Sequence, residues 1–201
     1  MALVLNGTSD TITGLQINSA NIVDGSITNS DLATGVGGKI LQEVQTVKTD
    51  TFSQSSVTKN TFSNDTGLNV TITPSSNSNK IRLTGTVNLA ASVNTVGHGI
   101  GLFKNGSIIT GATGDASGSN RSRVMQQNWS DTSYTGQISC LPFDFTDSPS
   151  TTSAITYGIR LIALTSSSTS DLYLNRSRSI SDDEGYKGMT ISVITAMEIA
   201  V

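Results

Sequence analysis

The sequence predicts an all-β protein, in which a short N-terminal shaft or collar segment precedes an antiparallel β-sandwich head of jelly-roll type. Two observations lead to this prediction. From residue 37 on, short runs of alternating apolar and polar residues recur about every ten residues, separated by Gly, Asn, Ser, Asp and Pro. No stretch of the chain has the 3.6-residue apolar period of a helix.

Residues 1–36 have a different pattern, in which a large apolar residue occurs at every fifth position. These positions are Ile12, Ile17, Ile22, Ile27 and Leu32. A period of five fits neither a helix nor a strand, so one chain cannot bury these side chains on one face of either. Three chains wound about a common axis could bury them against one another, and we expect a homotrimer core here. The alternative is a flexible polar leader whose period is accidental.

Residues 37–201 form the head in this prediction. Alternation over Lys80–Ala91 and Leu68–Thr73 places one strand face in the core and the other in water. The run Lys104-Asn105-Gly106-Ser107 predicts a hairpin, since Asn and Gly both tolerate positive φ. The other expected strands are 40–49, 97–104, 107–113, 123–128, 134–143, 153–164, 171–175 and 189–198.

Composition disfavours several classes of protein. The 201 residues include 30 serines and 28 threonines, but only 13% are charged and 5% aromatic, with a net charge of −3. This charge balance creates no field that attracts nucleic acid or an anionic membrane. No apolar run is long enough to span a bilayer, and the first residues lack the features of a secretory signal. We therefore expect no nucleic-acid binding and no membrane insertion.

The chain has few residues that carry chemistry. It contains one histidine, His98, and one cysteine, Cys140. These cannot form a Cys/His metal cluster within one chain, and a serine nucleophile would have a single imidazole as its base. We interpret His98 as a hydrogen-bonded histidine at a strand end and Cys140 as a small buried apolar residue. The sequence predicts no enzyme activity, no metal site and no cofactor.

The best candidate for a binding site surrounds the single tryptophan. Trp129, Gln127, Asp131 and Tyr134 combine an aromatic platform with amide and carboxylate groups, a combination suited to binding sugars. The competing interpretation places Trp129 at the end of the sandwich or at a seam between trimer subunits. The acidic run Ser181–Lys187 lacks the ligand spacing of a calcium loop, and we interpret it as a solvated turn.

Several segments resemble the fibre proteins of tailed bacteriophages, cyanophages among them. The stretch ANIVDGSITNSDLA at 20–33 is similar to their short shaft or collar element. Segments similar to their β-sandwich heads are 39–45, 66–81, 102–106 and 191–199. The resemblance implies a homotrimeric structural protein at the virion surface, synthesised in the host cytoplasm. Its N-terminal segment would attach to other virion proteins of the tail, baseplate or capsid. Its head would engage the host surface, with a host-surface glycan as candidate receptor.

Two other functions stay open at this point. A shaft as short as residues 1–36, without an evident anchor domain, also suits a capsid decoration or cement protein, in which the N-terminal segment grips the shell and the head covers it. A glycan-degrading spike would need paired carboxylates at a cleft, and the sequence offers few carboxylates.

Overall fold

The computed structural model describes residues 27, 39–92, 96–115, 121–130, 135–164 and 168–201, except for the side chains of Val96 and Ser130. The chain divides into two units, residues 1–39 and Ile40–Val201. In the first unit only Ile27, which is exposed, and Lys39 are described. The other members of the predicted trimer core lie outside the described residues; they are Ile12, Ile17, Ile22 and Leu32. The shaft, the trimer and the boundary after residue 36 therefore stay predictions.

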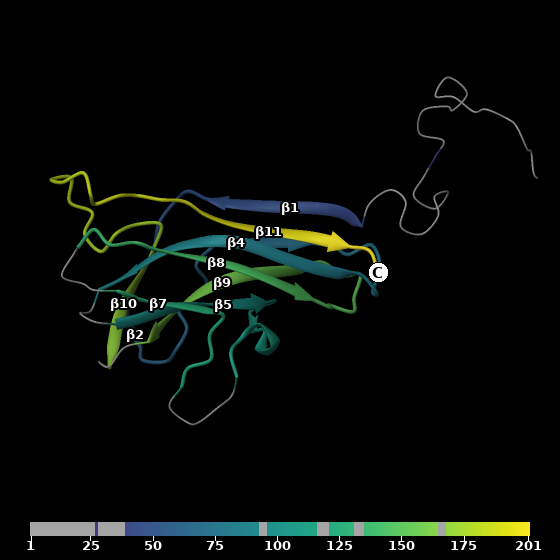
Figure 1. Ribbon diagram of the computed structural model, residues 1–201, viewed down its shortest axis with the longest axis horizontal. Coiled ribbons are helices and arrows are strands. Elements are labelled where there is room, and N and C mark those ends of the chain that lie inside the picture. The colour runs from purple at the N-terminus through teal and green to yellow at the C-terminus, as the bar shows by residue number, and fades with distance from the viewer. Residues whose placement is uncertain (1–26, 28–38, 93–95, 116–120, 131–134, 165–167) are drawn as a thin grey trace, which may run out of the picture. The chain divides into compact units, whose positions relative to one another are not determined.

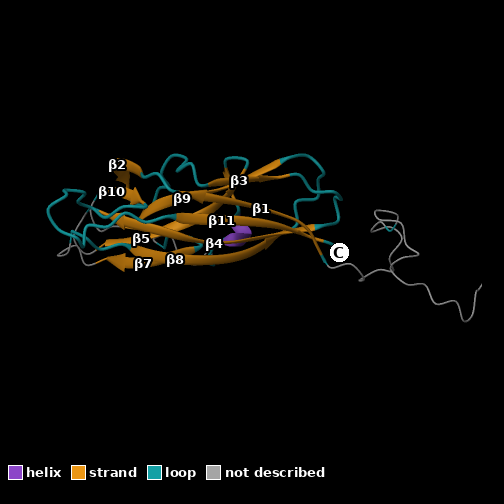
Figure 2. Cartoon of the chain, turned by 90° about the horizontal axis from the view of Figure 1, so that it is seen from above, coloured by secondary structure: helices purple, strands orange, loops and turns teal. Residues whose placement is uncertain are grey.

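The second unit consists of two antiparallel sheets (Figure 1 and Figure 2). Sheet A contains β1 (Ile40–Lys48), β2 (Phe52–Thr58), β4 (Lys80–Ala91), β8 (Ser139–Asp147), β10 (Thr169–Leu174) and β11 (Ser192–Ile199). Sheet B contains β3 (Asn69–Ile72), β5 (Val96–Lys104), β6 (Ser107–Ile108), β7 (Gln126–Ser130) and β9 (Ile155–Leu164). A single 3-10 turn at Thr110–Ala112 follows β6. The predicted all-β class and the pair of antiparallel sheets are confirmed.

Strand pairing is nested along the chain. The nested pairs are β1 with β11, β2 with β10, β3 with β9, β4 with β8, and β5 with β7, all of them antiparallel. Pairing of β4 with β11 and β10, and of β9 with β5, then joins these pairs into the two sheets. As a result, the first strand of the head lies beside the last.

Most strands lie where the alternation predicts them. β4 covers Lys80–Ala91 as expected, and the predicted hairpin forms with φ of 48° at Asn105 and 81° at Gly106. The sequence pattern does not predict β2, because its sequence FSQSSVT contains only two large apolar residues. The strand expected at 107–113 ends at Ile108, and those expected to begin at 123 and 134 begin three and five residues later.

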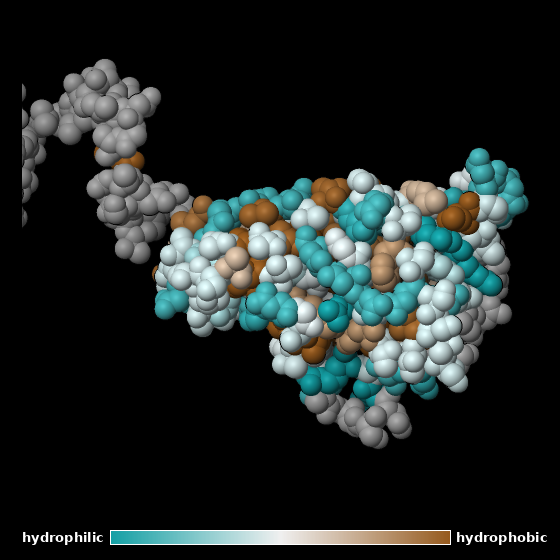
Figure 3. Space-filling view, turned by 180° about the vertical axis from the view of Figure 1, so that it is seen from behind, coloured by the Kyte–Doolittle hydropathy of each residue, from teal (hydrophilic) through white to brown (hydrophobic). Residues whose placement is uncertain are grey.

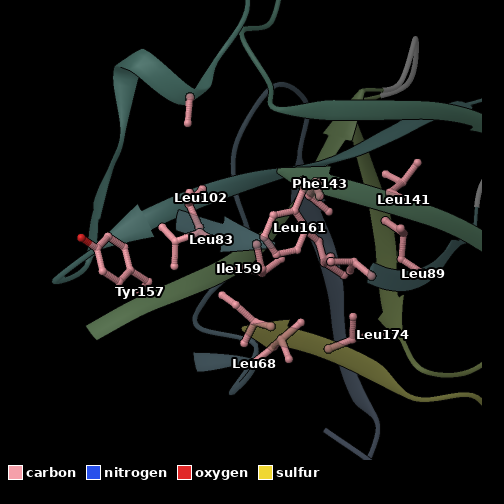
Figure 4. Packing of buried hydrophobic residues seen from close by; sticks show 14 of the residues in the cluster. Leu68, Leu83, Leu89, Leu102, Leu141, Phe143, Tyr157, Ile159, Leu161 and Leu174 are labelled. Carbon is pink, nitrogen blue, oxygen red and sulfur yellow. The ribbon is translucent and has the colours of Figure 1, made fainter. Parts of the chain in front are cut away.

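One layer of mostly aliphatic side chains fills the space between the sheets, together with Phe143 and Tyr157 (Figure 4). Leu83 of β4 lies beside Leu102 of β5 and near Ile159 and Leu161 of β9, and Leu89 of β4 lies at the other side of the cluster; all five are fully buried. Each strand contributes every second residue to this layer, as the strand period requires. The face seen in Figure 3 is mostly polar or neutral, with scattered apolar spots.

A buried carboxylate closes the end of the sandwich near the C-terminus. The Glu198 side chain lies on the inner face of β11 and has no exposed surface. It accepts hydrogen bonds from Gln42 Nε2, from Asn79 Nδ2, and from the backbone N–H and hydroxyl of Ser75. These donors replace the water that the carboxylate has lost, so its burial is tolerated.

Asp147 closes the same end of the sandwich from β8. Ile81 of β4 pairs with Glu198 on one side and with Asp147 on the other, so both carboxylates face inward in one row. Asp147 Oδ2 accepts hydrogen bonds from the Tyr157 hydroxyl at 2.7 Å and from Lys104 Nζ at 2.9 Å. Burial, and then the hydrogen bond to Asp147, raise the pKa of Tyr157, so its hydroxyl stays protonated and donates.

Glu198→Gln is expected to destabilise the protein most strongly near neutral pH. Burial alone would raise the pKa of Glu198, but the hydrogen bonds from Asn79, Gln42 and Ser75 outweigh it and lower the pKa from 4.5 to about 2. A carboxylate with a lowered pKa stabilises the fold above pH 4.5 and loses this contribution, about 3 kcal/mol here, as the pH falls toward 2.

Chemical denaturation of the parent and the variant between pH 7 and pH 2 measures this effect. The difference in unfolding free energy should shrink as the pH falls below 4.5. Glu43→Gln, which makes the same change at an exposed position of β1, is the matched control and should alter stability little at any pH. A difference between Glu198→Gln and parent that stays constant with pH would contradict the prediction.

Candidate functional site on the outer face of sheet B

The predicted binding residues that the structure describes lie on the outer face of sheet B. In the pairing of β7 with β5, Trp129 is opposite Gly97 and Gln127 is opposite Gly99. His98, between the two glycines, points into the interior and has no exposed surface. Because successive strand residues point to opposite faces, the glycines and their partners on β7 face outward.

Trp129 forms a platform on this face. Its side chain is 61% exposed, so it does not plug the end of the sandwich. A Cβ added to Gly97 would lie 3.6 Å from Trp129 Cε3 and 3.1 Å from Leu164 Cβ. The indole therefore lies close to the backbone of Gly97 and presents most of its surface to solvent. An aromatic ring held in this way suits stacking against the apolar face of a ligand.

Of the four predicted binding residues, the structure brings two together. Gln127 is exposed and lies two positions before Trp129 on the same face of β7. Asp131 and Tyr134 lie outside the described residues. The described part of the site thus consists of an indole and one amide side chain above the glycines of β5.

A hydrogen-bond group beneath the site joins β5, β7 and β8, and consists of the buried His98 and Ser139 with the exposed Asn128. His98 Nε2 lies 3.0 Å from Ser139 Oγ, and Asn128 Nδ2 donates to the same oxygen at 3.0 Å. Burial lowers the pKa of His98 to about 4, so its ring is neutral at neutral pH. His98 is hydrogen-bonded as predicted, but it lies within β5 rather than at a strand end. The group holds β7, the strand that carries Trp129, against β8.

Cys140 is exposed, and the prediction of a buried cysteine is wrong. Its neighbours Ser139 and Leu141 are both buried, so the alternation of β8 places Cys140 on the outer face of sheet A. The run Ile138–Leu141 contains apolar residues in both phases of the alternation. The pattern therefore does not decide which phase faces the core.

A small polar cavity lies on the same outer face as Trp129, toward the β5–β6 hairpin. Its volume is about 40 Å³, and the Arg160 guanidinium carbon on its wall lies 4.4 Å from the centroid of the Phe103 ring. The lining residues are Asp65, Asn69, Phe103, Gly106, Thr156, Gly158 and Arg160. The sequence pattern does not predict a site at these residues, because they come from separate segments and share no motif.

The acidic run Ser181–Lys187 is internally paired. Lys187 Nζ forms ion pairs with Asp183 at 2.5 Å and with Glu184 at 3.5 Å. In the part of the chain that the structure describes, no three His, Cys, Asp or Glu residues are grouped so that they could hold a metal ion.

Comparison of the chain with models of protein families gives no match, and comparison with curated proteins gives no similar sequence. Within the described ranges, no helix has the length and apolar character needed to cross a membrane.

Gly99→Ala is expected to displace β7 from β5. The added Cβ would lie 2.5 Å from the backbone oxygen of Gln126, and this oxygen cannot retreat without disturbing the ladder that positions Trp129. We expect a loss of stability of about 2 kcal/mol, typical of an overpacked site. The fluorescence of Trp129, the only tryptophan, should also change.

The matched control is Gly114→Ala, because among the described residues beyond its chain neighbours no atom lies within 4 Å of a Cβ added there. Thermal melting and tryptophan emission spectra of the three proteins provide the measurement. A melting curve and a spectrum of Gly99→Ala that both coincide with those of the control would count against the described contact between β5 and β7.

Proposed function

We propose that this chain is a non-enzymatic, homotrimeric fibre protein on the surface of a tailed phage, and that its head binds a glycan of the host surface. In this proposal residues 1–36 attach to the virion and residues 37–201 engage the host. The observation that carries it is the indole of Trp129, which lies close to Gly97 on sheet B and is 61% exposed. Tryptophan is highly buried on average in soluble proteins, whereas exposed aromatic rings are typical of binding surfaces.

The architecture of the head supports this proposal. The nested pairing from β1 with β11 inward to β5 with β7 is the strand order of a jelly roll. Viral capsid proteins and lectins use this architecture. A fold by itself does not assign a function. The exposed indole of Trp129 therefore carries the proposed function, and the fold is consistent with it.

Exposed apolar residues on sheet A support association with further copies. Leu41 and Val47 lie on the outer face of β1 and are 38% and 47% exposed, and Ile191, just before β11, is 50% exposed. β1 begins at Ile40, directly after the segment whose five-residue period predicts a trimer. Neighbouring copies held by that segment would have an apolar surface available for packing.

Trp129→Ala is expected to reduce binding of the full chain to host cells at least tenfold, because the stacking platform is removed. Flow cytometry with fluorescently labelled protein measures binding, before and after periodate oxidation of the cell-surface glycans. Tyr186→Ala is the matched control, since Tyr186 is a similarly exposed aromatic residue, at 59%, in a different region of the head. Equal binding by the Trp129 variant and the parent, or binding unaffected by periodate, would overturn the proposed receptor role.

The full chain is expected to have a mass three times 21.0 kDa in solution, measured by light scattering. Replacing Ile17 and Ile22 together by Ser should shift the mass toward that of one chain, because two of the five apolar positions become polar. A parent protein of 21.0 kDa would contradict the trimer. Binding to purified capsids but not to host cells would instead favour the capsid decoration function.

A further inference from the structure

We propose that the cavity at Arg160 binds the carboxylate of an acidic sugar, and that the ligand shared by this cavity and Trp129 is an acidic oligosaccharide. This inference rests on the proposed function, since it specifies the class of glycan. Both groups belong to the same surface, because Arg160 is opposite Gly101 in the pairing of β9 with β5 and so faces outward like Trp129.

Aromatic packing holds the Arg160 side chain in place. Its guanidinium carbon lies 4.4 Å from the centroid of the Phe103 ring, and Phe103 is only 7% exposed. Phe62 packs edge-on against Phe103, with 5.1 Å between the ring centroids. A guanidinium stacked on a fixed ring loses less side-chain freedom on binding a ligand than one that is free in solvent.

The guanidinium has hydrogen-bonding capacity left for a ligand. Among the described residues, the Phe103 ring is the only partner of the Arg160 guanidinium, and none of the ion pairs involves it. A guanidinium carries five N–H donors in a planar fork that matches the two oxygens of a carboxylate. Charge-assisted pairs of this geometry are among the strong hydrogen bonds of proteins.

The carboxylate of Asp65 on the cavity wall is engaged by neighbouring amides. Both Asp65 oxygens accept hydrogen bonds from Asn69 Nδ2 at 3.0 Å, and Oδ1 also accepts one from the N–H of Gly67 at 2.8 Å. Asn69 lies over Gly158, where an added Cβ would approach its Oδ1 to 2.1 Å. The cavity thus holds the Arg160 guanidinium, which has no ion-pair partner among the described residues, and a carboxylate whose oxygens already accept hydrogen bonds from Asn69 and Gly67. Asp65 retains lone pairs for sugar hydroxyl groups.

The dimensions of the surface favour an oligosaccharide. A cavity of about 40 Å³ has room for one small group such as a carboxylate, so the sugar ring that bears it must lie outside. Trp129 and Arg160 lie on opposite sides of β5, at Gly97 and Gly101. Four residues along the strand and two inter-strand spacings separate them by about 16 Å, more than one sugar ring spans.

The experiment is calorimetric titration of the full chain with two matched probes. One is an oligogalacturonide, and the other is the same oligosaccharide with its carboxylates methyl-esterified. The parent should bind the acidic probe at least tenfold more tightly. Arg160→Gln should remove this difference, whereas Arg160→Lys should retain only part of it, because an ammonium lacks the planar fork. Trp129→Ala should weaken the binding of both probes.

Arg82→Gln is the matched control, because it removes an exposed arginine from the outer face of sheet A. It should bind both probes as the parent does. Monomeric galacturonic acid and inorganic sulfate form two further arms and should bind at least tenfold more weakly than the acidic oligomer. Melting curves of all variants show whether the fold is retained.

Each outcome tests the acidic-sugar inference separately from the proposed function. Equal affinity of the parent for both probes, or failure to bind either probe while host cells are bound through Trp129, would overturn the acidic-sugar inference alone. A preference for the acidic probe that persists in Arg160→Gln would overturn the assignment to Arg160. Sulfate or the monomer binding as tightly as the oligomer would reveal a small-anion site and contradict a shared glycan ligand.

Discussion

Burial of a single layer of aliphatic side chains between two sheets is the interaction on which the rest of the head depends. With 35% hydrophobic residues, the chain fills this layer by placing Leu, Ile and Val at every second strand position. At the two ends of the sandwich the inner faces carry polar side chains, Glu198 and Asp147 at one end and His98 at the other. Each makes hydrogen bonds to residues of other strands or loops, because an unsatisfied buried group would cost much of a small net stability.

The choice of side chains also determines the outer face of sheet B. Gly97 and Gly101 of β5 have no side chains, and aromatic rings occupy the space above the backbone at these positions. A Cβ at Gly101 would approach the Phe62 ring to 2.4 Å, so a residue with a side chain there would displace that ring. Aliphatic residues fill most of the core, whereas Trp129 lies on the surface beside the backbone of β5.

Local features of this fold could be predicted from the sequence, and features that depend on distant pairing could not. The alternation of β4 and the Asn105-Gly106 turn are encoded within a few residues, and both lie as predicted. The contact of Trp129 with Gly97 depends on which strand pairs with β7, which no local pattern specifies. The orientation of Cys140 could not be predicted either, because apolar residues around it occur in both phases of the strand alternation. One sequence feature could have identified Arg160 as a candidate site residue: it is the single charged residue within the apolar run Tyr157–Leu164.

Under the proposed function, the two sheets have separate roles. The exposed apolar residues Leu41 and Val47 belong to sheet A, and we assign the contact between copies to this sheet in the proposal. Trp129 and Arg160 lie on sheet B, and the proposed function requires the outer face of this sheet to be free in every copy. Three copies would present three identical sites to a repetitive polysaccharide, and linked sites can exceed the affinity of one site by about 10²–10⁴ without any new contact. A platform made of one indole and one guanidinium, weak by itself, would then be sufficient for attachment.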